Sequence, residues 1–275
     1  GKIYCGTCHS AHGVDWNMER VSPLFLRVEN EDSSLCFACH LERGTGTDEG
    51  NHPVFREISN LPNLDGPPEH MRDLGAKFGQ DGTVICQSCH RVHGARDEKL
   101  LMVNNSNSAL CSNCHDDRYV GGFDEAQAKR THPVNTKPTR VTVPDNLLEL
   151  GSKLGDGGTI ICQTCHKPHK AEAGPKILVK RNDDAQLCVQ CHTTQANVLD
   201  SKHDMRLVEK ADPNVRGQTS HEGGACSACH VPHRGGGPKM WARPLGDSPD
   251  PMAATCLSCH RDGGPAEGHQ VGEFT

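Results

Sequence analysis

The feature that most constrains this chain is a five-residue motif, Cys-x-x-Cys-His, that occurs eight times in 275 residues. All 16 cysteines belong to these motifs, so none is left over. The motifs are Cys5-Cys8-His9, Cys36-Cys39-His40, Cys86-Cys89-His90, Cys111-Cys114-His115, Cys162-Cys165-His166, Cys188-Cys191-His192, Cys226-Cys229-His230 and Cys256-Cys259-His260. With one motif for roughly every 34 residues, little chain remains between them for a conventional domain.

The spacing of the motif has a direct chemical interpretation. Two thiols about one helical turn apart can each form a thioether to one haem, and the next imidazole reaches the iron as the proximal ligand. Zinc ribbons and redox-active dithiols are the alternatives for a single Cys-x-x-Cys pair. Neither gives a reason for His after every pair. We therefore predict eight covalently bound haem c groups, each with the motif His as its proximal ligand.

Composition explains how such a chain could fold. Its apolar residues make up 34%, its aromatic residues 4%, and its mean hydropathy is -0.62, whereas an average soluble domain is roughly 45–50% apolar. The 29 Gly and 17 Pro are scattered, which disfavours long regular elements. We expect mostly irregular coil with short α-helices and negligible β structure, elongated around a stack of haems that forms the core.

An internal repeat divides the chain. Residues 74–86 read LGAKFGQDGTVIC and residues 150–162 read LGSKLGDGGTIIC, each ending on the first Cys of a motif. Even-numbered motifs instead follow polar segments such as EDSSLC, NSALC and NDDAQLC, which are typical of helix N-caps. We predict a single haem-threaded domain of four two-haem modules, approximately residues 1–60, 61–140, 141–210 and 211–275.

The remaining histidines are candidates for the second axial ligand. Ten of the 18 His lie outside the motifs, against eight distal positions. Four follow the odd-numbered motif histidines by three residues, namely His12, His93, His169 and His233; four more follow the even-numbered motifs, namely His52, His132, His203 and His269. His70 and His221 are possible substitutes. The six Met residues have no recurring relation to the motifs, so we do not expect Met ligands.

Geometry limits which haem each distal His can serve. A His three residues after a proximal His starts on the same side of that porphyrin, so it should ligate a different haem. If the histidines between modules serve the odd-numbered motif that follows, the haem at Cys5 and Cys8 lacks a partner. Either His269 or another downstream His then folds back onto it, or another subunit donates the ligand.

The eight motifs resemble those of octahaem c-type cytochromes of the doubled Cys-x-x-Cys-His multihaem family, and the chain is similar to subunits of extracellular cytochrome filaments. The resemblance covers the whole chain through the motifs. It implies electron transfer, redox proteins or extracellular electron acceptors as partners, and a homopolymer.

Ligand saturation favours a carrier over an enzyme. An iron with two His ligands has no open position for substrate, so we expect no catalytic residue. The first alternative is a monomeric carrier in the periplasm or in an outer-membrane conduit. The second is an octahaem oxidoreductase of nitrogen or sulfur compounds, which would need one exchangeable iron site.

Charge and hydropathy bear on partners and location. The net charge of -6 offers no basic footprint for nucleic acid, and no apolar run reaches the roughly 18 residues of a membrane span. We expect many Lys and Arg beside haem propionates. Covalent haem attachment occurs outside the cytoplasm, so we expect an extracytoplasmic protein, extracellular or at the cell surface rather than periplasmic. Because residues 1–4 have no apolar core, we expect the export signal to have been removed already.

Overall fold

The computed structural model describes residues 2–11, 24–44, 49–60, 64–174, 176–208, 212–243, 249–264 and 266. Within these ranges the chain is mostly coil with short helices, and its only β pairing consists of isolated bridges. The predicted fold class is therefore confirmed.

The α-helices are α1 (Cys5–Cys8), α2 (Ser34–His40), α3 (Glu69–Asp73), α4 (Cys86–Cys89), α5 (Ala109–Ser112), α6 (Phe123–Ala128), α7 (Asp145–Glu149), α8 (Cys162–Cys165), α9 (Cys188–Cys191), α10 (Ser220–Ser227) and α11 (Pro251–Leu257). Single turns of 3-10 helix join them: η1 (Glu31–Ser33), η2 (Leu41–Arg43), η4 (Ile58–Asn60), η5 (Gln80–Gly82), η6 (Glu98–Leu100), η7 (Asp116–Arg118), η8 (Asp156–Gly158), η10 (Met205–Leu207) and η11 (Pro238–Met240), with the longer η9 (Thr193–Val198).

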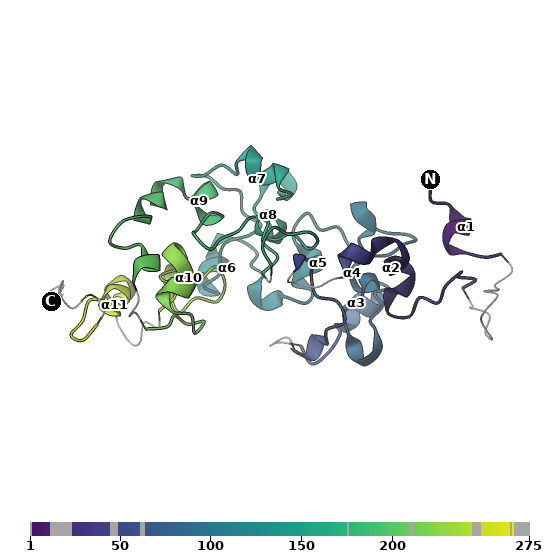
Figure 1. Ribbon diagram of the computed structural model, residues 1–275, viewed down its shortest axis with the longest axis horizontal. Helices are drawn as coiled ribbons and strands as arrows, with labels where there is room; N and C mark the ends of the chain where they lie inside the picture. The colour runs from purple at the N-terminus through teal and green to yellow at the C-terminus, as the bar shows by residue number, and fades with distance from the viewer. Residues whose placement is uncertain are drawn as a thin grey trace.

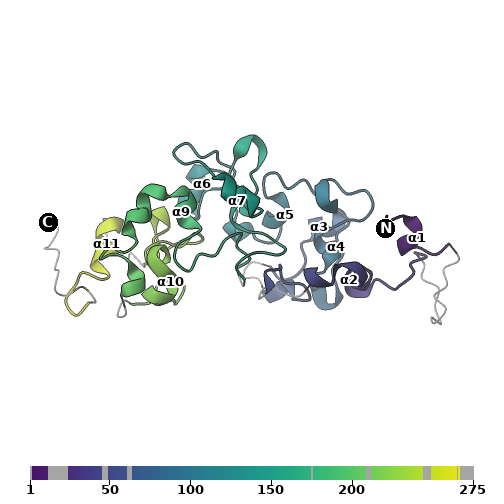
Figure 2. The ribbon, with the colours of Figure 1, turned by 45° about the horizontal axis from the view of Figure 1, so that its top comes forward.

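The molecule is elongated, and its motif-bearing helices follow the long axis in sequence order (Figure 1). The helices that carry the motifs run from α1 at one end through α2, α4, α5, α8, α9 and α10 to α11 at the other (Figure 1). A second view gives the same order, with α1 and α11 at opposite ends (Figure 2). Neighbouring motifs in the sequence are therefore neighbours in space.

The first three odd-numbered motifs form helices of one turn, α1, α4 and α8, with a shared way of starting. In α4, the Ser88 hydroxyl accepts the N–H of Ile85 at 3.0 Å and donates to the Lys77 carbonyl at 2.8 Å. Thr164 makes the same two bonds in α8, with Ile161 at 3.0 Å and Lys153 at 2.7 Å. The hydroxyl inside the motif thus satisfies an N–H that a short helix leaves unpaired.

The duplicated sequences adopt the same backbone. Gly75 and Gly151 follow α3 and α7 with φ of 96° and 101°, in the left-handed region where a residue with a side chain is strained. The N–H of Lys77 then bonds to the Gln87 carbonyl at 3.1 Å, as that of Lys153 bonds to the Gln163 carbonyl at 3.0 Å. The repeat in the sequence is therefore a repeat in structure.

The polar segments before the even-numbered motifs differ from the predicted N-caps. An Asn six residues before the first Cys accepts the N–H of a Leu: Asn30 from Leu35, Asn105 from Leu110 and Asn182 from Leu187, at 2.9–3.0 Å. Ser33 and Ser108, which precede α2 and α5, do not cap these helices.

The buried hydroxyls of Ser33 and Ser108 have a longer-range role. They accept the N–H of Cys86 at 3.0 Å and of Cys162 at 2.8 Å, the first residues of the odd-numbered motifs that follow. The prediction of local capping was wrong for Ser33 and Ser108, because each hydroxyl instead bonds to the first N–H of the helix at the next motif. Each bond joins two consecutive motifs.

The apolar core is divided into small clusters. One contains Met71, Ala76 and Met102, and another contains Val143, Leu147 and Val179. Clusters of this size cannot hold an elongated chain of this length together by burial of side chains alone. Among the described residues, no helix is long and apolar enough to cross a membrane.

Replacing Ser108 with Ala tests the link between consecutive motifs. We expect a loss of stability of about 1–2 kcal/mol, because the partly buried N–H of Cys162 loses its acceptor. Thermal unfolding followed by absorbance and circular dichroism would measure the change. Ser112→Ala is the matched control, since its hydroxyl bonds only to the Ala109 carbonyl of its own helix; equal effects of the two substitutions would contradict the expectation.

Candidate functional site

The histidines of the odd-numbered motifs are held in one orientation. Nδ1 of His9, His90, His166 and His230 lies 2.9–3.0 Å from the backbone carbonyls of Leu24, Lys99, Lys176 and Lys239, respectively. A carbonyl only accepts, so Nδ1 carries the proton and Nε2 keeps its lone pair. Such a bond fixes the ring and the tautomer that a metal needs.

Within the part of the chain that the structure describes, six pairs of imidazole rings lie opposite one another, and each pair joins one motif His to one predicted distal His. The pairs are His9–His93, His90–His169, His166–His233, His52–His115, His132–His192 and His203–His260, with ring centres 6.1–6.3 Å apart. Rings in direct contact lie closer, as His230 and Trp241 do at 4.6 Å.

The separation within the pairs fits a metal ion between two imidazoles. With metal–nitrogen bonds of about 2.0–2.1 Å and about 1.1 Å from nitrogen to ring centre, opposite axial ligands have ring centres about 6.3 Å apart. Among the described residues, no group of three or more His, Cys, Asp or Glu gathers as for a bare metal ion. Two protein ligands per site suit an iron whose other four ligands come from a porphyrin, so the residues present fit haem c.

The pairs follow a simple rule between neighbouring modules. The His of each of the first three odd-numbered motifs faces a His from the next predicted module, as His9 faces His93. The His of each of the last three even-numbered motifs faces a His from the preceding predicted module, as His115 faces His52. Neighbouring predicted modules therefore exchange one imidazole in each direction.

This arrangement differs from one sequence-based expectation. His9 has an imidazole partner in His93, so the first motif does not lack one. His93 belongs to the second predicted module. The histidines between modules, His52, His132 and His203, instead face the His of even-numbered motifs. Within the described ranges, no imidazole pairs with His40 or His230, and His12 and His269 lie outside those ranges.

The two possible substitute ligands, His70 and His221, are not in these pairs. His70 Nε2 lies 2.5 Å from Asn113 Oδ1. In the duplicated module, Asn146 occupies the same position and donates to Gln190 Oε1 at 3.1 Å. His70 therefore occupies the position of Asn146 and, like Asn146, contacts a residue inside an even-numbered motif.

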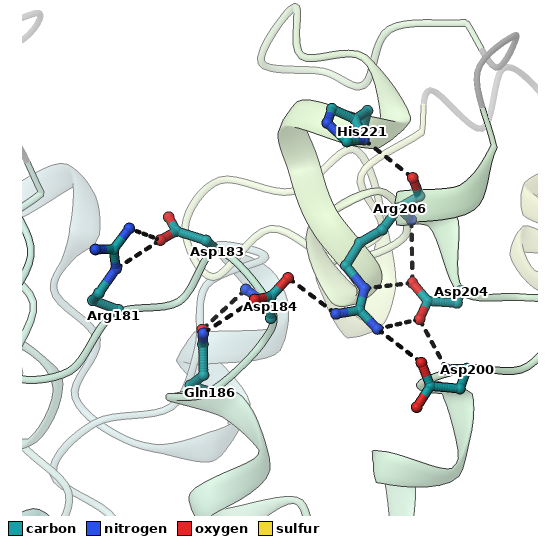
Figure 3. A network of polar contacts seen from close by, with 8 residues as sticks. All are labelled: Arg181, Asp183, Asp184, Gln186, Asp200, Asp204, Arg206 and His221. Atoms are coloured by element: carbon teal, nitrogen blue, oxygen red, sulfur yellow. Dashed lines mark hydrogen bonds and ion pairs between the residues drawn. The ribbon is translucent and has the colours of Figure 1, made fainter.

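His221 belongs to a polar network that supports the segment carrying His203. Its Nδ1 donates to the Arg206 carbonyl at 3.1 Å (Figure 3). The Arg206 guanidinium bonds to buried Asp204 and, at 3.0 Å, to Asp184; Asp200 lies 3.5 Å away. Arg206 lowers the pKa of the Asp204 carboxyl, so the pair stays ionised at neutral pH. Asp204 follows His203 directly, and the network thereby positions that imidazole opposite His260.

A second device, which we call the clasp, joins the segment before His52 to the loop that ends on Ala171. The N–H of His52 donates to the Pro168 carbonyl at 2.7 Å, and the N–H of Ala171 donates to the Gly50 carbonyl at 2.8 Å. Buried Asn51 accepts the N–H of Lys170 at 3.2 Å. The clasp connects two predicted distal imidazoles, His52 and His169, that belong to different imidazole pairs.

The same clasp occurs again one module later. His132 donates to the Pro232 carbonyl and Gly235 to the Arg130 carbonyl, both at 2.8 Å, and Thr131 accepts the N–H of Arg234 at 3.2 Å. Sequence reasoning missed Asn51 and Thr131. The only sign of them was their place before the shared His-Pro-Val, in NHPV and THPV.

Burial keeps three of the paired imidazoles neutral. It lowers the pKa of His115 and His169 to about 4 and that of His233 to about 3, with smaller contributions from neighbouring imidazoles and arginines. The neutral ring is the form that binds a metal ion. These three imidazoles can therefore coordinate at neutral pH without first losing a proton.

Cysteines of consecutive motifs lie close together. Side chains of Cys36 and Cys86, of Cys111 and Cys162, and of Cys188 and Cys226 hydrogen-bond to one another. Burial raises the pKa of Cys89 and of Cys165 to about 12. Haems attached there would follow one another closely in sequence order.

Comparisons with known proteins support a multihaem c-type cytochrome. A family model described as "Doubled CXXCH motif" matches residues 78–119, 154–197 and 220–265. The chain is 26% identical over 239 residues to a protein of Shewanella baltica (strain OS185) named "Multiheme cytochrome MtrA", covering 72% of this chain and 68% of the relative. No solved structure gave a significant match.

Replacing Asn51 with Ala tests the clasp. Loss of the buried acceptor should weaken it by about 1–3 kcal/mol, which corresponds to roughly ten- to hundredfold faster exchange of the His52 and Ala171 amide hydrogens. Hydrogen exchange read by mass spectrometry would measure this. Asn146→Ala, which removes an exposed amide contact, is the control; unchanged exchange in the Asn51 variant would contradict a role in the clasp.

Proposed function

We propose that this chain conducts electrons along eight haems that each have two His ligands. Its paired motifs and its similarity to a multihaem cytochrome support an extracytoplasmic multihaem c-type cytochrome. We further propose that it does so as the subunit of an extracellular filament, with redox proteins or external acceptors as its partners. The observation that carries the electron-transfer proposal is the set of six imidazole pairs at 6.1–6.3 Å.

The path of the electrons would follow the sequence. The contacts between Cys36 and Cys86 and their two counterparts place successive attachment sites side by side. The attachment helices are also ordered along the long axis from α1 to α11 (Figure 1). An electron that hops between nearest haems would then cross the molecule from one end to the other.

A carrier fits this arrangement better than an enzyme. An iron with imidazoles on both faces has no position for a substrate, and its surroundings are fixed in both redox states. A catalytic iron would need an exchangeable ligand. His40 and His230 mark the two described motifs at which an oxidoreductase activity would be sought.

The exchange rule supports assembly into a polymer. Within the chain, each pair of neighbouring modules exchanges one His in each direction. If the rule continues between two copies, His269 of one copy faces His40 of the next, and His12 of the next copy faces His230 of the first. Such a contact joins unlike surfaces and repeats without closing, which generates a filament.

Replacing His93 with Ala tests cross-ligation between modules. The wild-type protein should bind eight haems, all low-spin, and the variant should gain one high-spin haem, measured by pyridine haemochrome assay and electron paramagnetic resonance. The high-spin signal should vanish when Cys5 and Cys8 are also replaced by Ala. Persistence of the signal there, with its loss on replacing Cys86 and Cys89, would contradict cross-ligation. His70→Ala is the control and should leave every haem low-spin.

The filament proposal has its own test. Native protein should form rods of regular diameter in negative-stain images, and His12→Ala should reduce rod formation while leaving the six intrachain pairs low-spin. His70→Ala should assemble as wild type does. A native preparation that remains a compact monomer would overturn the filament and favour the monomeric carrier.

A further inference from the structure

Three arginines gather beside the His166–His233 pair. Arg234 Nη1 lies 2.5 Å from Asp117 Oδ2, and Arg118 Nε lies 3.8 Å from the same oxygen. The Arg216 guanidinium donates to the His233 carbonyl. One carboxylate thus faces three guanidinium groups, and this leaves positive charge for another anion to balance.

Two of these arginines act directly on the imidazoles. Arg118 lowers the pKa of both His166 and His233, after the larger effect of burial, and Arg216 also lowers that of His233. The arginines also repel one another: burial and then Arg234 and Arg118 lower the pKa of Arg216. Crowding of like charges in this way is unfavourable unless an anion lies among them.

The distal imidazole itself lacks a hydrogen-bond partner. Nδ1 of His233 is buried without a partner, although the corresponding atom of His132 bonds to the Pro133 carbonyl at 3.1 Å. If Nε2 faces the iron, Nδ1 carries a proton and needs an acceptor. An anion beside Arg216 would supply one.

A matched site one module earlier carries less charge. There Lys170 Nζ lies 2.5 Å from Glu42 Oε1, and Arg43 lowers the pKa of His169. These residues correspond to Arg234, Asp117 and Arg118, and Nδ1 of His169 is also buried without a partner. Arg43 is the one arginine among the groups that lower the pKa of His169, whereas both Arg118 and Arg216 lower that of His233.

The geometry of a haem narrows the choice of anion. Propionates extend from the edge of their own porphyrin, whereas Nδ1 of an axial ligand points away from that plane. The acceptor for Nδ1 must therefore come from a neighbouring haem. The clasp joins the His233 loop to the segment that carries His132, so the nearest candidate is the haem between His132 and His192.

We propose that Arg118, Arg216 and Arg234, with Nδ1 of His233, form a binding site for a propionate carboxylate of the haem attached at Cys188 and Cys191. The inference rests on the proposed function, because it requires haems at these motifs. The site ties two consecutive haems together. Its excess positive charge also raises their reduction potentials above those of the equivalent haems one module earlier.

Replacing Arg216 with Gln tests the site in the fully loaded protein. One or two of the eight components in a spectropotentiometric titration should shift to lower potential, because positive charge beside them is lost. Redox-difference infrared spectra should show a shifted propionate carboxylate band. Arg216→Lys keeps the charge and should retain the wild-type potentials.

Controls separate this site from a structural effect. Arg181→Gln removes an exposed charge that pairs with Asp183 and should change neither the potentials nor the band. In a background without Cys188 and Cys191, Arg216→Gln should leave the carboxylate bands unchanged. Equal effects of Arg216→Gln and Arg216→Lys, or no effect of Arg216→Gln on bands and potentials, would overturn the proposal. Fewer than eight low-spin haems in the wild type would instead count against the proposed function.

Discussion

The exchange of imidazoles between neighbouring modules is the constraint on which the rest of the structure depends. Side-chain clusters of three buried residues supply little cohesion along an elongated chain. The His pairs instead connect residues far apart in sequence, as His9 connects to His93 and His166 to His233. With a haem iron in each pair, every such connection would be a coordination bond across a flat apolar surface, and folding would be inseparable from cofactor binding.

The hydrogen bonds of the backbone serve this exchange. The bonds from Cys86 to Ser33 and from Cys162 to Ser108 join consecutive motifs on the attachment side. The two clasps join the loops of His52 and His169, and of His132 and His233, on the distal side. The His90–His169 and His166–His233 pairs are thus held on both sides by hydrogen bonds that do not depend on apolar packing. The single-turn helices only need to present two thiols and one imidazole.

The sequence predicted more of the fold than of the pairing. Cysteine spacing and low hydropathy were enough for the fold class, because a short motif that binds a large cofactor leaves few other solutions. The partner of His93 could not be predicted from the sequence. The spacing excludes only the haem at Cys86 and Cys89 and leaves the other seven haems as possible partners. His70, a possible substitute ligand in the sequence, contacts Asn113 in the structure, as Asn146 contacts Gln190. Asn51 and Thr131 could not be recognised because their partners lie over 100 residues away.

Because neighbouring modules exchange imidazoles in both directions, the exchange limits how the modules can move relative to one another. At each boundary one module supplies an imidazole to the odd-numbered site behind it and receives one at its own even-numbered site, as His93 and His52 do between the first two modules. Separating two modules would therefore open two iron sites at once, one on each side. Because both sites would open together, we expect adjacent modules to move as one body. A conductor gains from this, since the distance between haems then stays constant while the charge on them changes.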